Sequence, residues 1–293
     1  MLQHWSEVSF NSICMTVTDQ DFQLFIYALK TSSKYDFSEY SEKSLKRRLT
    51  KILVDNKLTL NALINRLKND SGFVEKIVKE ITVNTTELFR DPQVWHAIRY
   101  AILPKLKNNS VINIWHAGCS TGQEVYSMMI VLNEMELLDR AKIYATDLNT
   151  DVIEQARKGE YKYRFNIGYL DNFDKVVKEN PYNYEEYYDV PYEKYFTIDK
   201  ASDSIKMSDF LREKPIYKKH DLVKEGNTLY VKFDIILCRN VIIYFNYNLQ
   251  SKVFDLFHRN LYDSGCLLLG MHETILGSYS VKFQKKGHAY YKS

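Results

Sequence analysis

The sequence predicts an α/β protein in which an all-helical region is followed by a parallel sheet that carries a small inserted β-subdomain. Three observations support this fold class. Helical patterns fill the first 80 or so residues, β-rich and helical stretches alternate after residue 110, and short β-rich stretches gather late in the chain. We expect the helical domain and its linker to cover residues 1–90, and the second domain to cover residues 91–293.

The helical region begins with a stretch at 18–30, where Thr18 is a candidate N-cap and apolar residues recur every three or four positions. A second helix is expected at 41–53, and further helical patterns cover 59–68 and 72–81. The 41–53 helix has an apolar side and a basic side, the latter formed by Lys43, Arg47 and Lys51. This basic row is either a solvated helix face or a docking surface for an acidic partner.

Strands and helices then alternate at the spacing of a βαβ unit, which implies parallel strands. Strands are expected at 111–116 and 142–146, each followed by a helix. Two more buried strands are expected at 233–237 and 265–269, with a helix around 249–261 between them. These four strands would form the body of the sheet.

A tyrosine-dense stretch separates the two halves of this pattern, with nine tyrosines from residue 161 to residue 195. Short strands are expected next, at 194–198, 204–207 and 216–219. We interpret the region from about 192 to 219 as a small β-subdomain inserted into the α/β sheet. The pattern offers no account of the tyrosines themselves.

Composition excludes several classes of protein. Forty basic and 37 acidic residues give a net charge of +3, so nothing indicates a dedicated nucleic-acid binder. No apolar run approaches the roughly 20 residues of a membrane span, and the first residues lack the pattern of a secretory signal. Four cysteines without a CxxC pair indicate reduced thiols in a cytoplasmic protein, and no metal site is expected.

Candidate ligand-binding residues follow the predicted strands, at the edge where parallel sheets bind ligands. Gly118 and Gly122 link a strand to a helix, and they either admit a ligand close to the backbone or simply form a tight turn. Glu124 lies in the first helical turn, where its carboxylate could hold a ligand ammonium group. Asp147 ends the second strand and either binds ribose hydroxyls or caps the next helix.

Two later strand ends carry further candidates. Asp221 could accept a hydrogen bond from an adenine amino group while Leu222 packs on the ring, or it is an ordinary loop acid. Arg239 and Asn240 directly follow an apolar strand, where burying them unpaired would be costly. Tyr244 follows shortly afterwards and could point back into the same crevice.

Five segments, taken in this order, carry a resemblance to a known family: NTTELFR at 84–90, GCSTGQEVYS at 118–127, ATD at 145–147, CRNVIIYF at 238–245 and GMHE at 270–273. The basic segment SLKRRL at 44–49 fits the same pattern. Together they resemble the chemotaxis receptor methyltransferases, the CheR family of protein-glutamate O-methyltransferases. The resemblance spans nearly the whole chain and implies a helical domain, a Rossmann-like S-adenosylmethionine methyltransferase sheet and an inserted β-subdomain.

The resemblance also implies a cofactor, S-adenosylmethionine, with S-adenosylhomocysteine as the product. The implied cofactor-binding residues are Asn84, Thr86, Arg90, Gly118, Glu124, Asp147, Asp221, Leu222, Cys238, Arg239 and Asn240. Within this set, Glu124 would bind the methionine moiety, Asp147 the ribose, and Asp221 with Leu222 the adenine. Arg239 and Tyr244 would lie near the transferred methyl group as the catalytic pair.

The implied substrate is a set of glutamate side chains in the cytosolic helical domain of chemotaxis receptors, which would dock on Lys43, Arg47 and Lys51. The enzyme would then be cytoplasmic and recruited to receptor arrays at the inner face of the membrane. This chain departs from the family at Gln123, where the family has Glu, and at Asp221, where it has Asn. No glycine occurs between Phe196 and Met207, which argues against capture of a receptor's C-terminal pentapeptide there.

The expected chemistry needs no general base, because a glutamate with a pKa of about 4.3 is already ionised at neutral pH. We hypothesise that Arg239 orients the substrate carboxylate and that Tyr244 hydrogen-bonds near the reacting oxygen. Three alternatives remain: a methyltransferase for a small molecule or a non-receptor protein, a catalytically silent cofactor-binding scaffold, and a nicotinamide-dependent dehydrogenase. The last is disfavoured because the glycine turn lacks a second close glycine for a pyrophosphate.

Overall fold

A computed structural model describes residues 17–82 and 84–293, and the chain divides into two compact units at Ile81/Thr82. The sequence places this boundary nine residues later, at residue 90. The difference arises because Leu88 and Phe89 are buried in the core of the second unit. The Phe89 amide also donates a hydrogen bond to Ser127 Oγ at 2.8 Å, which ties the linker to the sheet domain.

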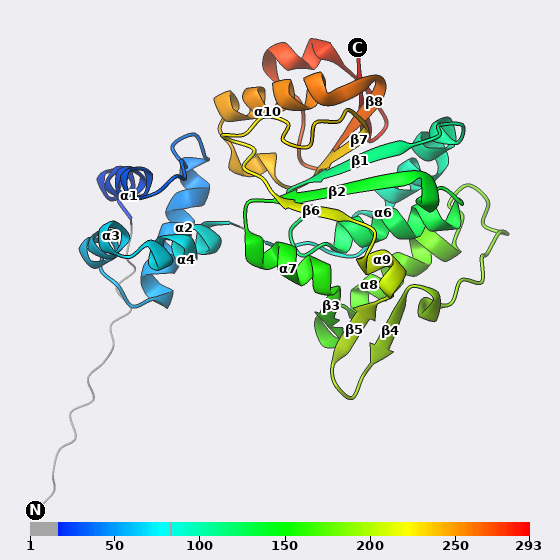
Figure 1. The fold of residues 1–293 in the computed structure, drawn as a ribbon, viewed down its shortest axis with the longest axis horizontal. Helices are drawn as coiled ribbons and strands as arrows, with labels where there is room; N and C mark the ends of the chain where they lie inside the picture. Colours follow the sequence, from blue (N-terminus) through cyan, green and yellow to red (C-terminus); the bar gives the residue numbers. More distant parts are fainter. Residues whose placement is uncertain (1–16, 83) are drawn as a thin grey trace, which may run out of the picture. The chain divides into compact units, whose positions relative to one another are not determined.

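Four helices form the described part of the first unit (Figure 1): α1 (Asp19–Ser32), α2 (Glu42–Asp55), α3 (Leu60–Asn69) and α4 (Ser71–Ile81). These confirm the four predicted helices. Thr18 caps α1 through a reciprocal capping box with Asp21. On α2 the predicted apolar side is buried, while Lys43, Arg47 and Lys51 are exposed.

The second unit is built on a seven-stranded sheet in the order β6-β2-β1-β7-β8-β10-β9. Its parallel strands are β6 (Ile216–Lys219), β2 (Ala141–Asp147), β1 (Ile112–Ala117), β7 (Phe233–Cys238) and β8 (Leu261–Leu269). An antiparallel hairpin extends the sheet beyond β8 and consists of β9 (Phe283–Lys286) and β10 (Ala289–Lys292). The four strands predicted for the body of the sheet are confirmed as β1, β2, β7 and β8.

Helices cover both faces of this sheet. On one face lie α6 (Gln123–Glu134), α7 (Thr150–Lys158) and the helical segment of α5 (Pro92–Ala97), η1 (Ile98–Ile102) and η2 (Leu103–Leu106), whereas α10 (Tyr247–Asn260) lies on the other. Accordingly, Ile114 packs into the core beneath α6, and the Trp115 ring meets Phe257 of α10 at 5.5 Å. The chain adds strands on one side of β1 with β2 and β6, and on its other side with β7 and β8. The strand order therefore reverses between β1 and β7, the place where sheets of this kind bind ligands at their carboxyl ends.

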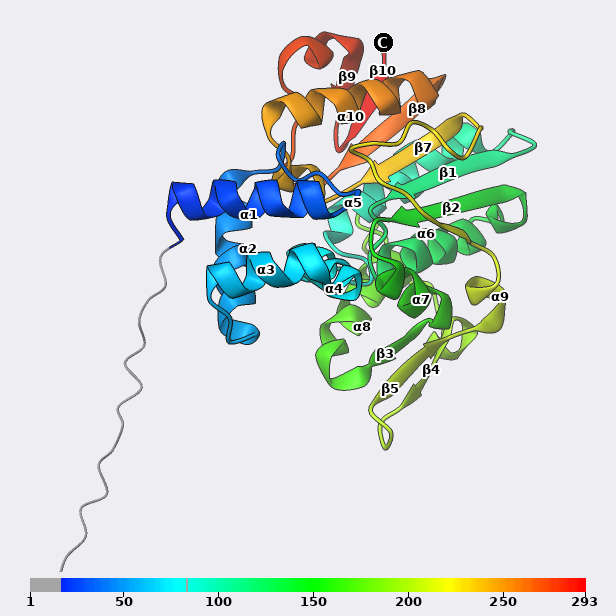
Figure 2. The same ribbon diagram turned by 60° about the vertical axis from the view of Figure 1, so that its left-hand side comes forward.

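A separate three-stranded antiparallel sheet has the order β3-β5-β4, with β3 (Glu160–Lys162), β5 (Ser204–Met207) and β4 (Phe196–Asp199). In both views it lies at the opposite end of the unit from the β9–β10 hairpin (Figures 1 and 2). The assignment of 216–219 to this subdomain is wrong, because β6 pairs in parallel with β2. Its alternation of exposed Ile216 and buried Tyr217 suits the edge of either sheet, so the pattern could not distinguish them.

The tyrosine-dense stretch contains α8 (Ile167–Phe173), the π-helical turn η5 (Asp174–Lys178) and a long irregular segment over 179–191. Two of its tyrosines are buried in the core, and Tyr169 donates a hydrogen bond to the carbonyl of Thr86 at 3.0 Å. In contrast, Tyr182, Tyr184 and Tyr187 are largely exposed. One stretch thus supports the linker and also presents aromatic rings to solvent.

The described helices are short. The longest, α1, α2 and α10, have 14 residues each, whereas a membrane span needs about 20. Within the described ranges, no helix combines the length and the apolar content that a bilayer crossing requires.

Candidate functional site

The residues that follow β1, β2, β6 and β7 meet at the carboxyl edge of the sheet. Register pairs Ala117 with Thr146, and Asp147 with Lys219, so the ends of β1, β2 and β6 are level. The pairing of His116 with Leu237 brings the end of β7 to the same edge. The strand-end candidates chosen from the sequence therefore belong to one region of the molecule.

The turn after β1 has a conformation that depends on glycine. Gly118 and Gly122 have φ angles of +83° and +90°, in the left-handed region that side chains rarely adopt. A Cβ at Gly118 would lie 2.5 Å from the Val241 side chain, and one at Gly122 would lie 2.7 Å from Ala156. Between them, the buried Ser120 hydroxyl has no hydrogen-bond partner within residues 17–82 and 84–293. The turn is tight, and it leaves a polar group that a ligand can satisfy.

The carboxylate of Asp147 is anchored by the backbone. Its two oxygens accept hydrogen bonds from the amides of Ser120 and Asn149, both at 2.9 Å. It is not the N-cap of α7, since Asn149 occupies that position and accepts from the Asp151 amide. Burial raises the pKa of Asp147, and the two amide hydrogen bonds counteract part of that rise. Asp147 is thereby oriented as an acceptor at the end of β2.

Arg239 lies at the centre of a buried group of charges. Its Nη1 donates to Glu124 Oε2 at 3.2 Å, and its Nη2 donates to Asp91 Oδ2 at 2.7 Å and to the Arg90 carbonyl at 3.0 Å. The side chain is only 1% exposed, and its Nε has no partner in the described ranges. The two carboxylates compensate the charge of the buried arginine, because apolar surroundings alone would leave that charge unpaired at a large cost.

Glu124 is shared between Arg239 and a second partner, His116. Its Oε1 lies 2.9 Å from His116 Nδ1, and the His116 ring is fully buried. Burial alone would raise the pKa of Glu124, but the His116 hydrogen bond and the Arg239 charge lower it below the ordinary value. Glu124 is therefore an ionised acceptor. His116 Nε2 is buried without a partner in the part of the chain that the structure describes.

The turn after β7 is held by Glu273, in the GMHE segment after β8. One of its oxygens accepts from the amides of Asn240 at 2.8 Å and Gly270 at 2.6 Å, and the other accepts from the Ile243 amide at 3.2 Å. Asn240 has a φ of +60°, a strained value for a residue with a side chain. Glu273 thus maintains the turn that places Arg239.

The linker reaches the site through its backbone and Asp91. Phe89 and Asp91 both have left-handed φ angles, +52° and +59°, so the chain turns sharply around Arg90. The Arg90 carbonyl accepts from Trp95 Nε1 and from Arg239, each at 3.0 Å. The Asn84 amide group, in contrast, bonds to Thr82 rather than to a strand end.

The Asp221–Leu222 turn and Tyr244 make fewer contacts with the other candidate residues than Glu124 and Arg239 do. Asp221 accepts from the Val223 amide at 2.9 Å in a local turn, and the neighbouring His220 amide donates to the Asp147 carbonyl at 3.0 Å. Asp221 and Leu222 therefore lie beside the end of β2. Tyr244 is half-buried in the turn η7 (Ile242–Tyr244), and its hydroxyl bonds to no residue within 17–82 and 84–293.

Sequence reasoning missed His116, Asp91 and Glu273. His116 is the last-but-one residue of β1, and its position next to a glycine turn is a signal that could have identified it. Asp91 directly follows the NTTELFR motif and Glu273 ends the GMHE motif, but only the fold reveals that they hold Arg239 and its turn.

The fold and the site together define the class. Rossmann-like proteins whose strand order reverses at the centre bind nucleotide-containing cofactors at that edge, with a glycine turn after β1 and an acid after β2. Asp147 suits a ribose diol, ionised Glu124 suits an ammonium group, and the unpartnered Ser120 hydroxyl adds a further polar contact. This set of acceptors fits S-adenosylmethionine.

Comparison with protein families gives the same result for nearly the whole chain. Residues 84–173 and 175–291 match the family described as CheR methyltransferase, SAM binding domain. Residues 20–82 match CheR methyltransferase, all-alpha domain. The chain belongs to the CheR family of S-adenosylmethionine-dependent methyltransferases.

Relatives from several bacteria are similar over most of their length. A Pseudomonas putida protein provisionally named methyltransferase Cher3 is 35% identical, over 91% of this chain and 93% of its own. A chemotaxis protein methyltransferase of Borreliella burgdorferi is 28% identical, over 92% and 93% of the two chains. Among solved structures, a TehB-like methyltransferase of Corynebacterium glutamicum is 12% identical with a TM-score of 0.36, over 67% of this chain and 87% of its own.

Proposed function

We propose that this protein transfers a methyl group from S-adenosylmethionine to glutamate side chains of chemotaxis receptors, forming methyl esters. The observation that carries the proposal is the Glu124–Arg239–Asp91 charge group at the carboxyl edge of a CheR-family sheet. The relatives named chemotaxis protein methyltransferases support the choice of receptor.

The acceptor carboxylate requires orientation and desolvation rather than deprotonation, because glutamate is ionised at neutral pH. Nearby thiols do not compete as nucleophiles, since burial raises the pKa of Cys119 and Cys238 well above their ordinary values. When bound, S-adenosylmethionine supplies a methyl group on a sulfonium, which a carboxylate oxygen can displace in line. The protein's task is to align the two reactants at about 3 to 3.5 Å.

Each acceptor at the edge has a distinct task in this proposal. Glu124, kept ionised by His116 and Arg239, holds the ammonium of the methionine moiety. Asp147 accepts from the ribose hydroxyls, and the Asp221–Leu222 turn borders the adenine. Asp221 can accept from the adenine amino group but cannot donate to the ring.

We propose for Arg239 a role that differs from the sequence-based hypothesis. Three of its five N–H donors are engaged by Glu124, Asp91 and the Arg90 carbonyl, and its side chain is only 1% exposed, so a substrate carboxylate has little access to the remaining two. We assign it as a positioning residue that fixes Glu124 and the linker. The Tyr244 hydroxyl bonds to none of the residues that the structure describes, and Tyr244 is the candidate to bond near the reacting oxygen.

Receptor recognition is assigned to α2. Lys43 and Arg47 are exposed, and Lys51 pairs with Asp55 one helical turn away. This row suits the acidic methylation helices of a cytosolic receptor domain. The β4–β5 turn is short and closed by its own hydrogen bonds from Ala201 and Ser202 to Asp199. We therefore propose that docking proceeds without capture of a C-terminal pentapeptide at this turn.

The test is incubation of the protein with S-adenosylmethionine labelled in its methyl group and a cytosolic receptor fragment. We expect base-labile label on the fragment, released as methanol at alkaline pH, and none on a matched fragment whose acceptor glutamates are replaced by alanine.

Two results would contradict the proposal. Label that accumulates in a small-molecule extract would instead favour a small-molecule methyltransferase. Tight binding of S-adenosylhomocysteine without transfer to any receptor fragment would favour a cofactor-binding scaffold.

A further inference from the structure

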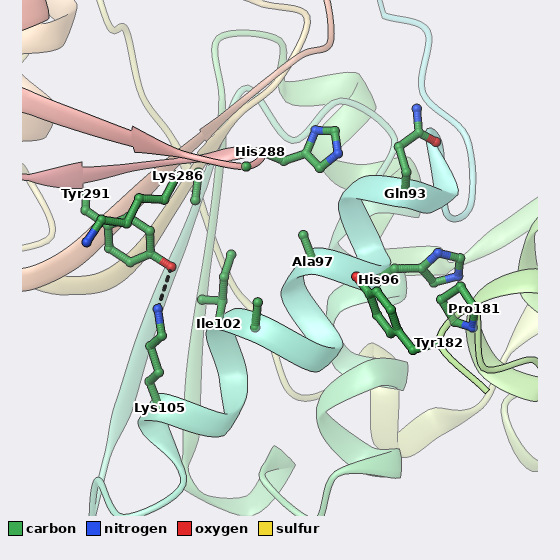
Figure 3. Close-up of a pocket in the computed structure, with 13 residues that line it drawn as sticks. Gln93, His96, Ala97, Ile102, Lys105, Pro181, Tyr182, Lys286, His288 and Tyr291 are labelled. Atoms are coloured by element: carbon green, nitrogen blue, oxygen red, sulfur yellow. Dashed lines mark hydrogen bonds between the residues drawn. The ribbon is translucent and has the colours of Figure 1, made fainter.

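A second concave site lies away from the strand-end residues, beside the β9–β10 hairpin (Figure 3). This cavity of about 410 Å³ is bounded by three segments: the α5–η2 helical segment, the start of the exposed tyrosine loop at Pro181 and Tyr182, and the hairpin over 286–291. Its volume lies within the range of small-molecule sites. None of the strand-end residues assigned to S-adenosylmethionine lines it.

Apart from two tyrosines, the ionisable residues that line the cavity are basic. Its lining contains Lys105, Lys286, His96 and His288, and no acidic residue. Lys105 Nζ donates to the Tyr291 hydroxyl at 3.2 Å and lies 4.7 Å from the centre of that ring. Lys286 lies 5.8 Å from the same ring. Two lysines therefore converge on one aromatic group without a carboxylate partner in the lining, which favours an anionic ligand.

The two ends of the cavity differ in character. Figure 3 shows Lys105, Lys286 and Tyr291 at one end and His96, Pro181 and Tyr182 at the other. Figure 3 shows Ala97 and Ile102 of the helical segment between these two ends, and Ala101 of the same segment also lines the cavity. A ligand that fills this space needs an anionic group at one end and a flat apolar body at the other.

Tyr182 is well placed to hold such a body. Its ring is 71% exposed, yet it packs edge-on against Tyr100 at 5.4 Å, which orders the ring beside the cavity. His96 is fixed through Nε2, 2.8 Å from the Lys175 carbonyl. A carbonyl can only accept, so Nε2 is the donor in this hydrogen bond. Stacking on a tyrosine ring suits a nucleobase.

We propose that this cavity is a binding site for a purine mononucleotide, separate from the S-adenosylmethionine site. The phosphate binds between Lys105 and Lys286, and the base lies against Tyr182 and His96. The ribose then spans the alanine-lined wall. The inference rests on the cavity alone and does not depend on the receptor substrate proposed above.

The experiment is isothermal titration calorimetry of the whole protein with guanosine 5′-monophosphate. Saturating S-adenosylhomocysteine is present throughout, so that the cofactor site is occupied. We expect saturable binding at one site, with guanosine and inorganic phosphate each binding about tenfold more weakly or worse. Absence of saturable heat up to millimolar nucleotide would overturn the proposal, and so would equal affinity for inorganic phosphate alone.

Matched variants locate the binding. The pair Lys105→Glu and Lys286→Glu should weaken nucleotide binding by about tenfold or more, whereas Lys107→Glu and Lys285→Glu, outside the lining on neighbouring segments, should have little effect. Tyr182→Ala should weaken it about tenfold, whereas Tyr184→Ala, 93% exposed and outside the lining, should not. Equal losses in lining and control variants would assign the binding to general surface charge and reject this site.

Discussion

Cationic side chains occur in two contrasting settings in this protein. Arg239 is buried between Glu124 and Asp91, at 3.2 and 2.7 Å. The basic row on α2, formed by Lys43, Arg47 and Lys51, is exposed. Among the described residues, only Lys51 of this row forms an ion pair, with Asp55. A buried cation must be compensated by the fold, so it fixes geometry and is poorly screened by salt. An exposed row stabilises the fold little, so it is available to a partner.

The largest expected effect comes from removing the buried cation. Arg239→Ala leaves two carboxylates without their partner, and breaking a buried pair in this way costs about 3 to 5 kcal/mol. We expect methylation to be abolished and the free energy of unfolding to fall by about 3 to 5 kcal/mol. Chemical denaturation and the methyl ester assay measure the two effects.

The matched control is Arg259→Ala, which removes an arginine that is 75% exposed and pairs with Asp255 on the same helix. Its stability should change by about 1 kcal/mol or less, with methylation retained. Equal destabilisation by the two substitutions would mean that the Arg239 group is no more important to the fold than a surface pair.

Asp147→Asn tests the acceptor at the end of β2 while preserving its shape. The amide has one acceptor oxygen instead of two, so it cannot keep the hydrogen bonds from Ser120 and Asn149 and also serve a ribose diol. We expect affinity for S-adenosylhomocysteine to fall roughly tenfold to a hundredfold, as measured by calorimetry. Unchanged affinity would remove Asp147 from the cofactor site.

Tyr244→Phe separates positioning of the acceptor from binding of the cofactor. Loss of one hydroxyl near the reacting oxygen should lower kcat by about tenfold and leave cofactor affinity nearly intact. Tyr247→Phe, on an exposed ring at the start of α10, is the control and should leave both unchanged. A fall in cofactor affinity with constant kcat would place Tyr244 in the cofactor site instead.

The backbone plan of the site was predictable from the sequence. Apolar runs ending in Gly118, Asp147 and Arg239 identified β1, β2 and β7, and parallel strands bring their carboxyl ends to one edge. The helical region was predictable for a similar reason, because Leu45 and Leu49 repeat at the helical period. The spacing of apolar residues indicates which face of a helix or strand is buried, and this was sufficient to predict these helices and strands.

The sequence did not predict which strands pair with each other or which charged side chains form ion pairs. β6 has the same alternation whether it joins β2 or the small sheet, and β3 has only three residues. The ion pair of Arg239 with Asp91 joins residues 148 positions apart, and it depends on the left-handed turn around Arg90. Such contacts depend on tertiary packing that no local pattern encodes.

A smaller effect on stability is expected from the ionisation of Glu124, and this effect depends on pH. Its folded pKa is lowered by His116 and Arg239, so it binds fewer protons than in the unfolded chain. Its stabilising contribution is therefore present above the unfolded value of about 4.3 and is lost as pH falls through the folded pKa. We expect Glu124→Gln to be less stable than the parent at pH 7, and the difference in stability between them to shrink as the pH falls below about 4.3. A gap that widens on acidification would contradict the assignment.

The smallest effect is expected at the exposed row, where Lys43→Glu with Arg47→Glu should leave stability unchanged and raise KM for a receptor fragment. At low salt we expect an increase of roughly tenfold, which shrinks as salt is raised because the Debye length falls from about 30 Å at 0.01 M to about 8 Å at 0.15 M. The control pair Lys57→Glu and Lys68→Glu carries the same charge change on other exposed positions of the first unit. If both pairs raise KM equally, the receptor senses net charge rather than the α2 row. If salt has no influence on KM for the parent protein, the contact is not electrostatic, and the contrast with buried Arg239 fails.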